Sequence, residues 1–287
     1  MNYEYKQIGK YKPIYEYCRK VSEAVPYWFE ADYEQWLESF MDDTDYDGEK
    51  MFRELITVGA FCEGRVVGFV QFGIPMYVYA ENGEKDYFAE CGTIRNFYFD
   101  KEHHCGKELI YNAEKYFFGK KVSRQYAFFH AFGMTCNAGH GKLYCGLLHI
   151  EDILFKFGYE KEHENVYYKR LITENDVPSD KIAVNYGAIT LKGLQEFTIE
   201  GGGRAVGAGA LVYLPQGEIC YLKWIYVYDA EQGKGYASAA LQTIFAHLYS
   251  KGIRRLDTDT ADGNLIAQKL YTKVGFDDMG RTRSYLK

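Results

Sequence analysis

A glycine-containing loop near the end of the chain joins a strand-like segment to a helix-like one. The apolar run Tyr221–Val227 predicts a strand, and the pattern from Ser238 to Tyr249 predicts an amphipathic helix. Unpaired N–H groups and the macrodipole at a helix start favour phosphate oxygens, and glycines leave the backbone open to a ligand. The order of elements therefore predicts a phosphate site. Its loop consists of Gln232, Gly233, Lys234, Gly235, Tyr236 and Ala237.

Several kinds of protein place glycines between a strand and a helix. A Walker loop is excluded, because no Gly-Lys-Ser/Thr ends the motif. A dinucleotide-binding finger has the Gly233-x-Gly235 spacing, with Asp257 or Asp259 about 20 residues further on. Against it, Ser238 replaces the third glycine, and too little chain follows for the remaining βαβ units. A turn that needs glycine and binds nothing is the third interpretation.

Two motifs in this region resemble one family. The segment from Leu222 to Ala237 resembles motif A of GNAT-type N-acetyltransferases, whose pattern Arg/Gln-x-x-Gly-x-Gly/Ala is met by Gln232, Gly235 and Ala237. A second signature of that family is matched from Asn264 to Phe276, and a strand-like segment lies between the two motifs. The resemblance covers roughly residues 185–287. It implies transfer of an acetyl group from acetyl-CoA, as cosubstrate, to an amine.

The resemblance also implies which residues hold acetyl-CoA. The phosphate loop is expected to bind the pyrophosphate, and the backbone around Ile225, Tyr226 and Val227 to pair with the pantetheine arm as an added strand would. Asn264 either orients CoA or caps the helix that follows it, and Ala267 lies in the same signature.

The catalytic residues are implied in the same way. Tyr271 lies where many family members carry a tyrosine general acid, although a tyrosine buried for packing is the alternative. The general base is predicted among Glu218, Asp257 and Asp259, and Glu218 is the first candidate. The family's common acidic position in this strand is Lys223, so a simple carboxylate base is not expected there.

The first half of the chain reads as a diverged copy of the second. Two strands within Leu55–Pro75 precede Thr93–Phe99, and Tyr98 then aligns with Tyr226. A helix over 109–118, a strand over 125–132 and a helix over 143–157 follow in the order of the second copy. The turn Phe157-Gly158-Tyr159 matches Val274-Gly275-Phe276. Preserved order with drifting spacing is typical of an internal duplication.

The two copies differ where function is expected. Only Gly106 remains of the first phosphate loop, and Glu108 would repel a pyrophosphate unless Lys107 compensates. Two helices, predicted over Pro13–Val25 and Ala31–Asp42, have no counterpart in the second copy. In the family these helices help to wall the acceptor site. The second copy is therefore expected to complete its pocket with the first, near their junction.

The predicted fold class is α/β (α+β), with two GNAT-like domains, each a mixed, mostly antiparallel sheet flanked by helices. We expect a degenerate domain over 1–173, a linker over 174–182 and the acetyl-CoA domain over 183–287. A net charge of −6 gives no general basis for binding nucleic acid or anionic membranes. Neither a targeting segment nor a membrane span is evident, and seven scattered cysteines suit a reducing compartment, so a cytoplasmic protein is expected.

Two classes of function remain open on this basis. The first is an N-acetyltransferase acting on a small-molecule or peptide amine, and the second is a non-catalytic acyl-CoA-binding sensor or interaction module. No metal is expected, because His103-His104-Cys105 has no second cluster at zinc spacing.

Overall fold

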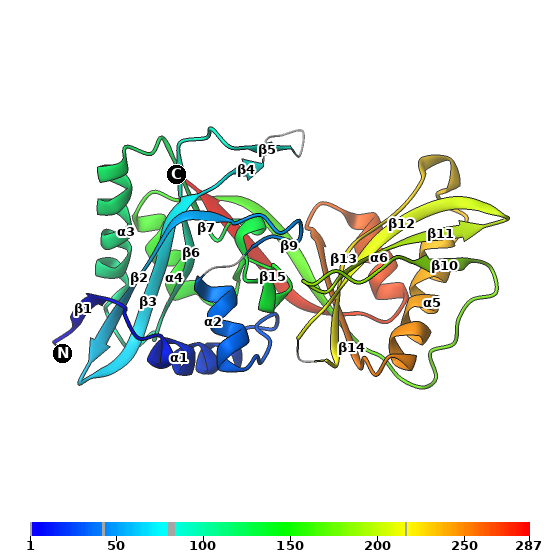
Figure 1. Cartoon of the computed structure of the whole chain (residues 1–287), viewed down its shortest axis with the longest axis horizontal. Coiled ribbons are helices and arrows are strands. Elements are labelled where there is room, and N and C mark those ends of the chain that lie inside the picture. The colour runs from blue at the N-terminus through cyan, green and yellow to red at the C-terminus, as the bar shows by residue number, and fades with distance from the viewer. Residues whose placement is uncertain (1, 42–43, 80–83, 216) are drawn as a thin grey trace. The chain divides into compact units, whose positions relative to one another are not determined.

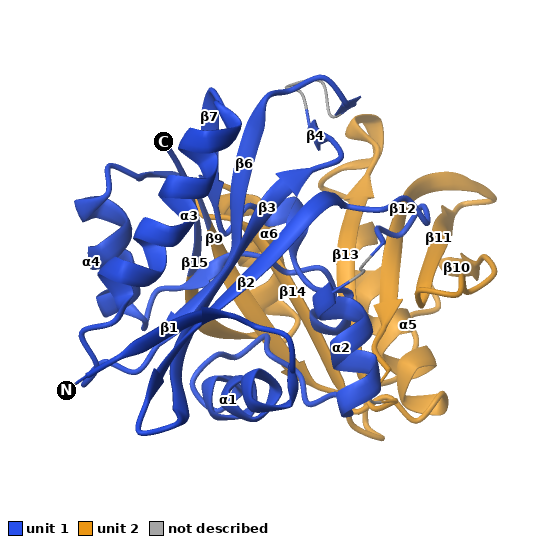
Figure 2. Cartoon of the chain, turned by 60° about the vertical axis from the view of Figure 1, so that its left-hand side comes forward, with its two compact units in different colours: residues 1–164, 282–287 blue, residues 165–281 orange. Residues whose placement is uncertain are grey.

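The computed structural model describes residues 2–41, 44–79, 84–215 and 217–287. It forms two compact units (Figure 2), and each is described by itself. Unit 1 contains residues 1–164 and 282–287, and unit 2 contains residues 165–281. Both units combine helices with a mixed, mostly antiparallel sheet, as Figure 1 shows, which confirms the predicted fold class.

The sheet of unit 1 has the strand order β1-β2-β3-β6-β7-β15. All neighbours are antiparallel except β6 and β7, which are parallel. A short hairpin and one short strand lie beside it. The strands are β1 (Glu4–Gln7), β2 (Phe52–Cys62), β3 (Arg65–Pro75), β4 (Val78–Tyr79), β5 (Lys85–Asp86), β6 (Cys91–Phe99), β7 (Arg124–Ala127), β8 (Leu143–Tyr144) and β15 (Asp277–Leu286).

Helices cover both faces of this sheet. On one face, the ring of Phe69 packs against Tyr17 and Phe40, which belong to the first two helices. On the other face, Phe72 packs against Phe117 of the third helix, and the fourth helix packs on the third. The predicted pair of N-terminal helices is therefore present. The four helices are α1 (Lys12–Ser22), α2 (Tyr33–Met41), α3 (Gly106–Lys120) and α4 (Leu148–Lys156). The predicted end of the second, Asp42, lies outside the described residues.

Unit 2 has the strand order β9-β14-β13-β12-β11-β10, in which only β13 and β14 are parallel neighbours. Helices α5 and α6 pack on one face, where Leu222 of β13 meets Ile244 and Phe245 of α5 in a single core. The elements are β9 (Glu160–Leu171), β10 (Ala183–Tyr186), β11 (Leu194–Gly201), β12 (Arg204–Tyr213), β13 (Ile219–Val227), α5 (Tyr236–Ser250), β14 (Arg255–Ala261) and α6 (Leu265–Lys273). Between β9 and β13, the described residues form no helix.

Each sequence copy contributes its last strand to the other unit. Residues 165–171 of β9 follow the first copy but pair with β14 in unit 2. Residues 282–286 of β15 end the second copy but pair with β7 and β8 in unit 1. Tyr285 is fully buried there, and its hydroxyl donates to Glu151, which also accepts from Arg283. Because of this exchange, the compact units do not follow the ranges 1–173 and 183–287.

The turns that lead into the exchanged strands are alike. Gly158 and Gly275 both have positive φ, +84° and +88°, and each follows a helix. The N–H of the next residue reaches back to the helix in both, Tyr159 to Leu154 O at 3.1 Å and Phe276 to Tyr271 O at 3.0 Å. This glycine C-cap satisfies carbonyls at the helix end. The structural match supports the predicted duplication.

Two predicted elements of the first copy are shorter than expected. The strand predicted over 125–132 ends at Ala127, because Phe128 has a positive φ of +54°, and residues 130–132 form a 3₁₀ helix, η1. The helix predicted over 143–157 begins at Leu148, because Leu143 and Tyr144 form β8 and pair with β15. Strand pairing with a segment far away in the sequence decides the second case.

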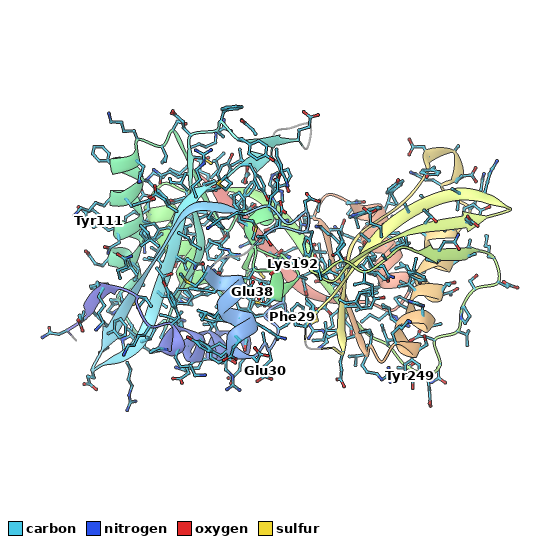
Figure 3. The ribbon with its side chains drawn as sticks, in the orientation of Figure 1. Phe29, Glu30, Glu38, Tyr111, Lys192 and Tyr249 are labelled. Atoms are coloured by element: carbon cyan, nitrogen blue, oxygen red, sulfur yellow. The ribbon has the colours of Figure 1, made fainter. Side chains whose placement is uncertain are left out.

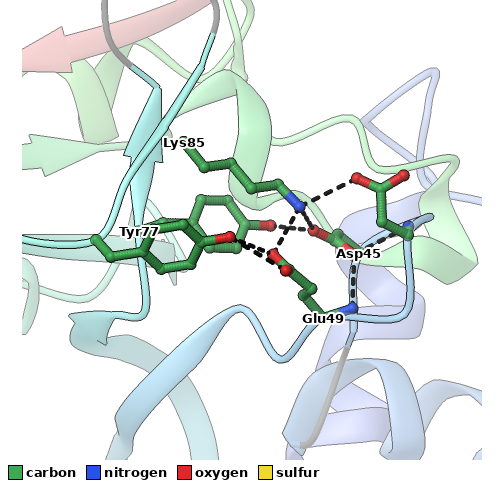
Figure 4. Close-up of polar contacts among 6 residues, drawn as sticks. Asp45, Glu49, Tyr77 and Lys85 are labelled. Carbon is green, nitrogen blue, oxygen red and sulfur yellow. Dashed lines mark hydrogen bonds and ion pairs between the residues drawn. The ribbon is translucent and has the colours of Figure 1, made fainter.

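A charged cluster ties the segment after α2 to the β4–β5 hairpin of unit 1 (Figure 4). The Lys85 ammonium donates to Asp45, Asp47 and Glu49 at 2.6, 3.0 and 2.8 Å, and the Tyr77 hydroxyl donates to Asp45. Burial raises the pKa of Asp45, but the hydrogen bonds from Lys85 and Tyr77 outweigh it and hold this pKa below its usual value. The cluster therefore stabilises unit 1 through the ionised form of Asp45.

Candidate functional site

The predicted phosphate loop has the backbone of a ligand cradle. Gly235 is the N-cap of α5, with a φ of +79°, and Gly233 has a φ of +76°. Residues with a side chain are strained in this conformation, so glycine is favoured at both positions. Tyr236 and Ala237 open the helix, and the ring of Tyr236 packs over Gly201, where an added Cβ would lie 2.7 Å from it.

The N–H groups of this loop remain available. In the part of the chain that the structure describes, none of the N–H groups from residue 233 to 238 donates to a protein acceptor, and the first bond of α5 runs from Ala239 N to Gly235 O. Two side chains of the loop hydrogen-bond to the segment that precedes it. Gln232 Nε2 donates to Val227 O and Asp229 Oδ1, and Lys234 Nζ donates to Glu231 at 3.0 Å. This arrangement suits a phosphate group.

Strands β13 and β14 separate just before this loop. Their parallel pairing ends at Leu222 and Thr258, and a register shift against β12 makes Lys223 a bulge residue. Beyond this fork, residues 223–227 have no strand partner on the β14 side among the described residues. The result is an open backbone edge that leads from the fork to the phosphate loop.

The direction of the backbone groups along this edge follows from the ladder. Tyr228 N donates to Val206 O, and alternate residues of an antiparallel strand bond to the same neighbour. Tyr226 therefore bonds toward β12, whereas Ile225 and Val227 present their N–H and C=O groups to the gap, where Val227 O already accepts from Gln232 Nε2. The predicted pairing of a pantetheine arm with Ile225 and Val227 is geometrically open. Tyr226 offers only its ring, which is 49% exposed.

Tyr271 of α6 is brought to the fork. It is 4% exposed, and its ring lies 5.3 Å from those of Tyr168 and Phe276. Burial raises the pKa of its hydroxyl, while a hydrogen bond with Thr258 opposes that rise. Thr258 in turn donates to Leu222 O at 2.9 Å, at the last paired residue of β13. The phenol is thus protonated at neutral pH and stands where the strands part.

Asn264 and Ala267 lie at the start of α6. The side chain of Asn264 accepts from Ala267 N at 3.2 Å, which is a helix cap. Of the two roles left open for Asn264, capping is therefore the one its contacts display. Contact with CoA stays a prediction for both residues.

The three base candidates have different surroundings. Glu218 is exposed and precedes β13, four residues before the fork, so the structure does not bring it to Tyr271. Asp257 is fully buried and accepts from Tyr167 at 2.7 Å, and burial raises its pKa. Asp259 is half-buried, and it is the first residue of β14 after the segment that pairs with β13. Its side chain lies on the same face of the sheet as that of Asp257.

Two side chains hold Asp259 that sequence reasoning did not identify. The Tyr221 hydroxyl and the Asn165 amide each donate to one of its oxygens. Asn165 belongs to β9, the strand contributed by the first copy, so no pattern local to the second copy could have indicated it.

The first copy has the same fork between its parallel strands, and a buried side chain lies there. Its parallel pairing ends at Ile94 and Ala127, and Arg95 is the bulge residue. The Arg95 side chain is 2% exposed and donates to the carbonyls of Ser39, Phe132 and Gly133. The bulge residue at the same place in unit 2, Lys223, is exposed.

The loop of the first copy is closed as well. The ring of Phe99 lies against Gly106, where an added Cβ would be 2.6 Å away, and His149 Nε2 lies 2.9 Å from Phe99 O. Gly106 lacks the positive φ of Gly235. The prediction that the first copy has lost acyl-CoA binding agrees with this geometry and stays a prediction.

A cavity of about 420 Å³ lies in unit 2 beside the start of α5. Ser238 and Gln242 line it from α5, Lys273 from the end of α6, and Arg170 from β9. Arg170 is paired with Asp176. Lys273 adds positive charge near the phosphate loop.

No helix among the described residues has the length and apolarity that a membrane span needs. Within the same residues, no three His, Cys, Asp or Glu side chains gather as potential metal ligands.

Comparisons with known proteins agree with this geometry. The model of the acetyltransferase (GNAT) family matches residues 151–276. No curated protein matches the chain.

Solved structures share the fold over the whole chain. A tandem GNAT protein from the clavulanic acid biosynthesis pathway has a TM-score of 0.66 at 10% identity, covering 100% of this chain and 98% of its own. A GCN5-related N-acetyltransferase from Sphaerobacter thermophilus also has 0.66, at 11% identity, with 99% and 95% covered. At such identities the likeness concerns the fold. Residues 151–276 thus match the model of the acetyltransferase (GNAT) family, and the chain as a whole has the fold of a tandem GNAT protein.

Proposed function

We propose that unit 2 transfers an acetyl group from acetyl-CoA to an amine. The observation that carries this proposal is the continuity of three features: the open phosphate loop, the unpaired edge of β13, and Tyr271 at the fork. An extended cosubstrate on this edge would have its pyrophosphate at the loop and its thioester at the fork. The first copy has the fork without the open loop, so we assign one cosubstrate site to the chain.

The chemistry follows from the groups at the fork. A neutral amine attacks the thioester carbonyl, a C–N bond forms, and the C–S bond breaks as the thiolate leaves. Tyr271 gives its proton to that thiolate. The nitrogen loses a proton to a base, for which we favour Asp259 through a water, since Glu218 lies at the other end of the strand and Asp257 is fully buried. Solvent returns the proton to Tyr271.

Other parts of the function remain as predicted from sequence. The acceptor is a small-molecule or peptide amine, and its site near the junction of the two copies is a prediction. A cytoplasmic location rests on the cysteine pattern.

An experiment separates the enzyme from an acyl-CoA-binding sensor. The full chain is incubated with acetyl-CoA and a panel of amines, free CoA thiol is recorded, and CoA binding is measured in parallel by calorimetry. Amine-dependent thiol release supports the transferase. CoA binding without release by any amine would favour the sensor, and failure to bind CoA would overturn both.

A further inference from the structure

An exposed row of aromatic side chains follows β13 on the face away from the helices. Trp224, Tyr226 and Tyr228 are 36%, 49% and 42% exposed. The ring centroids of Trp224 and Tyr226 are 5.5 Å apart, and those of Tyr226 and Tyr228 are 5.6 Å apart. Ile225, between the first two, packs into the core beneath α5. Since side chains alternate along a strand, the aromatic rings lie on the opposite face. We call these three residues the aromatic row.

The same position in unit 1 is buried. Tyr98, the counterpart of Tyr226, is 2% exposed, and its ring lies 4.7 Å from Trp28, in the segment that joins α1 to α2. The helices α1 and α2 cover this face in unit 1, and the described residues of unit 2 provide no such helices. In unit 2, large aromatic side chains are therefore exposed on the face that helices cover in unit 1. An exposed group of apolar side chains is typical of a binding surface.

Carboxylates share this face with the aromatic row. Along β11 the buried Phe197 and Ile199 face the core, and Glu196, Thr198 and Glu200 are exposed on the other side. The strand register places Glu196 across Ala210 from Trp224, with only alanine between them. The side-chain carboxylates of Glu196 and Glu200 have no hydrogen-bond or ion-pair partner among the described residues. Aromatic faces together with unpaired carboxylates attract organic cations.

The aromatic row begins at the fork. Trp224 is the second residue after Leu222, the last residue that pairs with β14. Tyr228 lies four positions after Trp224, so the row extends for about 13 Å at about 3.3 Å per residue. An acceptor lying on it would have one end at the thioester and the other beside Tyr228 and Glu200.

We propose that this face holds an acceptor amine that carries a second positive charge. This inference rests on the proposed function, because the thioester must lie at the fork. The reacting nitrogen must be neutral in order to attack, so it cannot be the cation that the face recognises. A second, protonated amine about 6–10 Å away would lie over the rings of Tyr226 and Tyr228 and be paired with the carboxylates.

The test compares two acceptors of equal length, hexamethylenediamine and hexylamine. We expect kcat/KM for the diamine to exceed that for the monoamine by roughly tenfold or more in the wild-type chain. Tyr228→Ala and Glu200→Gln should each bring the ratio toward one. Tyr111→Ala is the matched control: Tyr111 is 54% exposed on α3 of unit 1, where it points away from the helix (Figure 3), and the ratio should keep its wild-type value.

The outcomes distinguish this proposal from the one on which it rests. Equal kcat/KM for both amines, with thiol released by each, would overturn the proposal that this face binds a dication (the dication platform) and leave the transferase intact. A diamine preference that survives in Tyr228→Ala and Glu200→Gln would also overturn the platform. Thiol release by neither amine would count against the platform, and release by no amine of the wider panel would count against the transferase. If Tyr228→Ala and Glu200→Gln changed only the oligomeric state, measured by sedimentation, the face would be assigned to contact with a second copy of the chain, and the platform would be overturned.

Discussion

Replacing Tyr271 by phenylalanine removes one oxygen at the fork and leaves the surrounding packing in place. The ring keeps its neighbours Tyr168 and Phe276 at 5.3 Å, and Thr258 keeps its bond to Leu222 O. Loss of one hydrogen bond costs about 0.5–1.5 kcal/mol of folding free energy. We therefore expect a folded protein with nearly unchanged CoA affinity, because the hydroxyl lies at the fork, where we propose that the thioester binds, and not at the phosphate loop.

The expected effect on turnover is much larger. General acid catalysis contributes about 10²–10⁴-fold, which corresponds to about 3–5 kcal/mol of activation free energy. The variant should therefore lose at least about 100-fold in kcat. In the wild-type chain, burial raises the pKa of Tyr271, and an acid is lost as the pH rises through its pKa. The decline of kcat due to this group should accordingly occur above about pH 10.

The assay is release of free CoA thiol at saturating acetyl-CoA, with CoA affinity measured by calorimetry. Tyr168→Phe is the control, because Tyr168 is an equally buried tyrosine in contact with Tyr271, and it should retain wild-type turnover. Wild-type kcat in Tyr271→Phe would refute the acid role and leave Tyr271 as a packing residue. An equal loss in both variants would attribute the effect to packing.

Three further predictions concern binding and stability. Gly235→Glu should abolish CoA binding in a calorimetric titration, because it strains a φ of +79° and adds negative charge at the loop. The control is Gly217→Glu: Gly217 has a similar φ of +80°, but an added Cβ there would meet no atom within 4 Å, and this variant should bind CoA normally. Tyr285→Ala should destabilise unit 1 by about 3–5 kcal/mol in urea unfolding, because it empties a fully buried site; a change below about 1 kcal/mol would contradict the exchanged strand as a core element. Lys85→Met should raise the depressed pKa of Asp45. A carboxyl with a lowered pKa stabilises the folded state above its unfolded pKa, and this contribution is lost as the pH falls. The free energy of unfolding in urea should therefore be lower for the variant than for wild type at about pH 7, and it should fall less than that of wild type below about pH 4. Identical pH profiles would contradict this role of Lys85.

The local features of the second copy could be predicted from sequence because they depend on neighbouring residues. Glycines at 233 and 235 follow a strand and precede a helix, and both have the positive φ that such a turn requires. The turns at Gly158 and Gly275 were recognisable as counterparts for the same reason. Patterns of this kind are fixed within a few residues.

Features that depend on strand pairing could not be predicted. The bulge at Lys223 and the fork after Leu222 arise from the register of β13 against two other strands. The exchange of β9 and β15 joins segments more than 90 residues apart, as the bond from Asn165 to Asp259 illustrates. No spacing in the sequence encodes such a pairing, so the predicted domain ranges could not include the exchange.

The exposed aromatic row illustrates a different limit. Trp224, Tyr226 and Tyr228 read as ordinary strand residues in a chain that contains 28 tyrosines. Their significance depends on which face of the sheet is covered, and therefore on the absence of helices that the first copy has. Burial in the assembled unit distinguishes Tyr226 from its buried counterpart Tyr98.

We propose that one of the two copies holds acetyl-CoA and does so at the loop before α5. Calorimetric titration of the full chain with CoA tests it most directly. We expect one CoA per chain, with binding lost in Gly235→Glu and kept in a variant of the first loop, Gly106→Ala, that remains folded. Two equivalent sites per chain, or undiminished binding in Gly235→Glu, would contradict it.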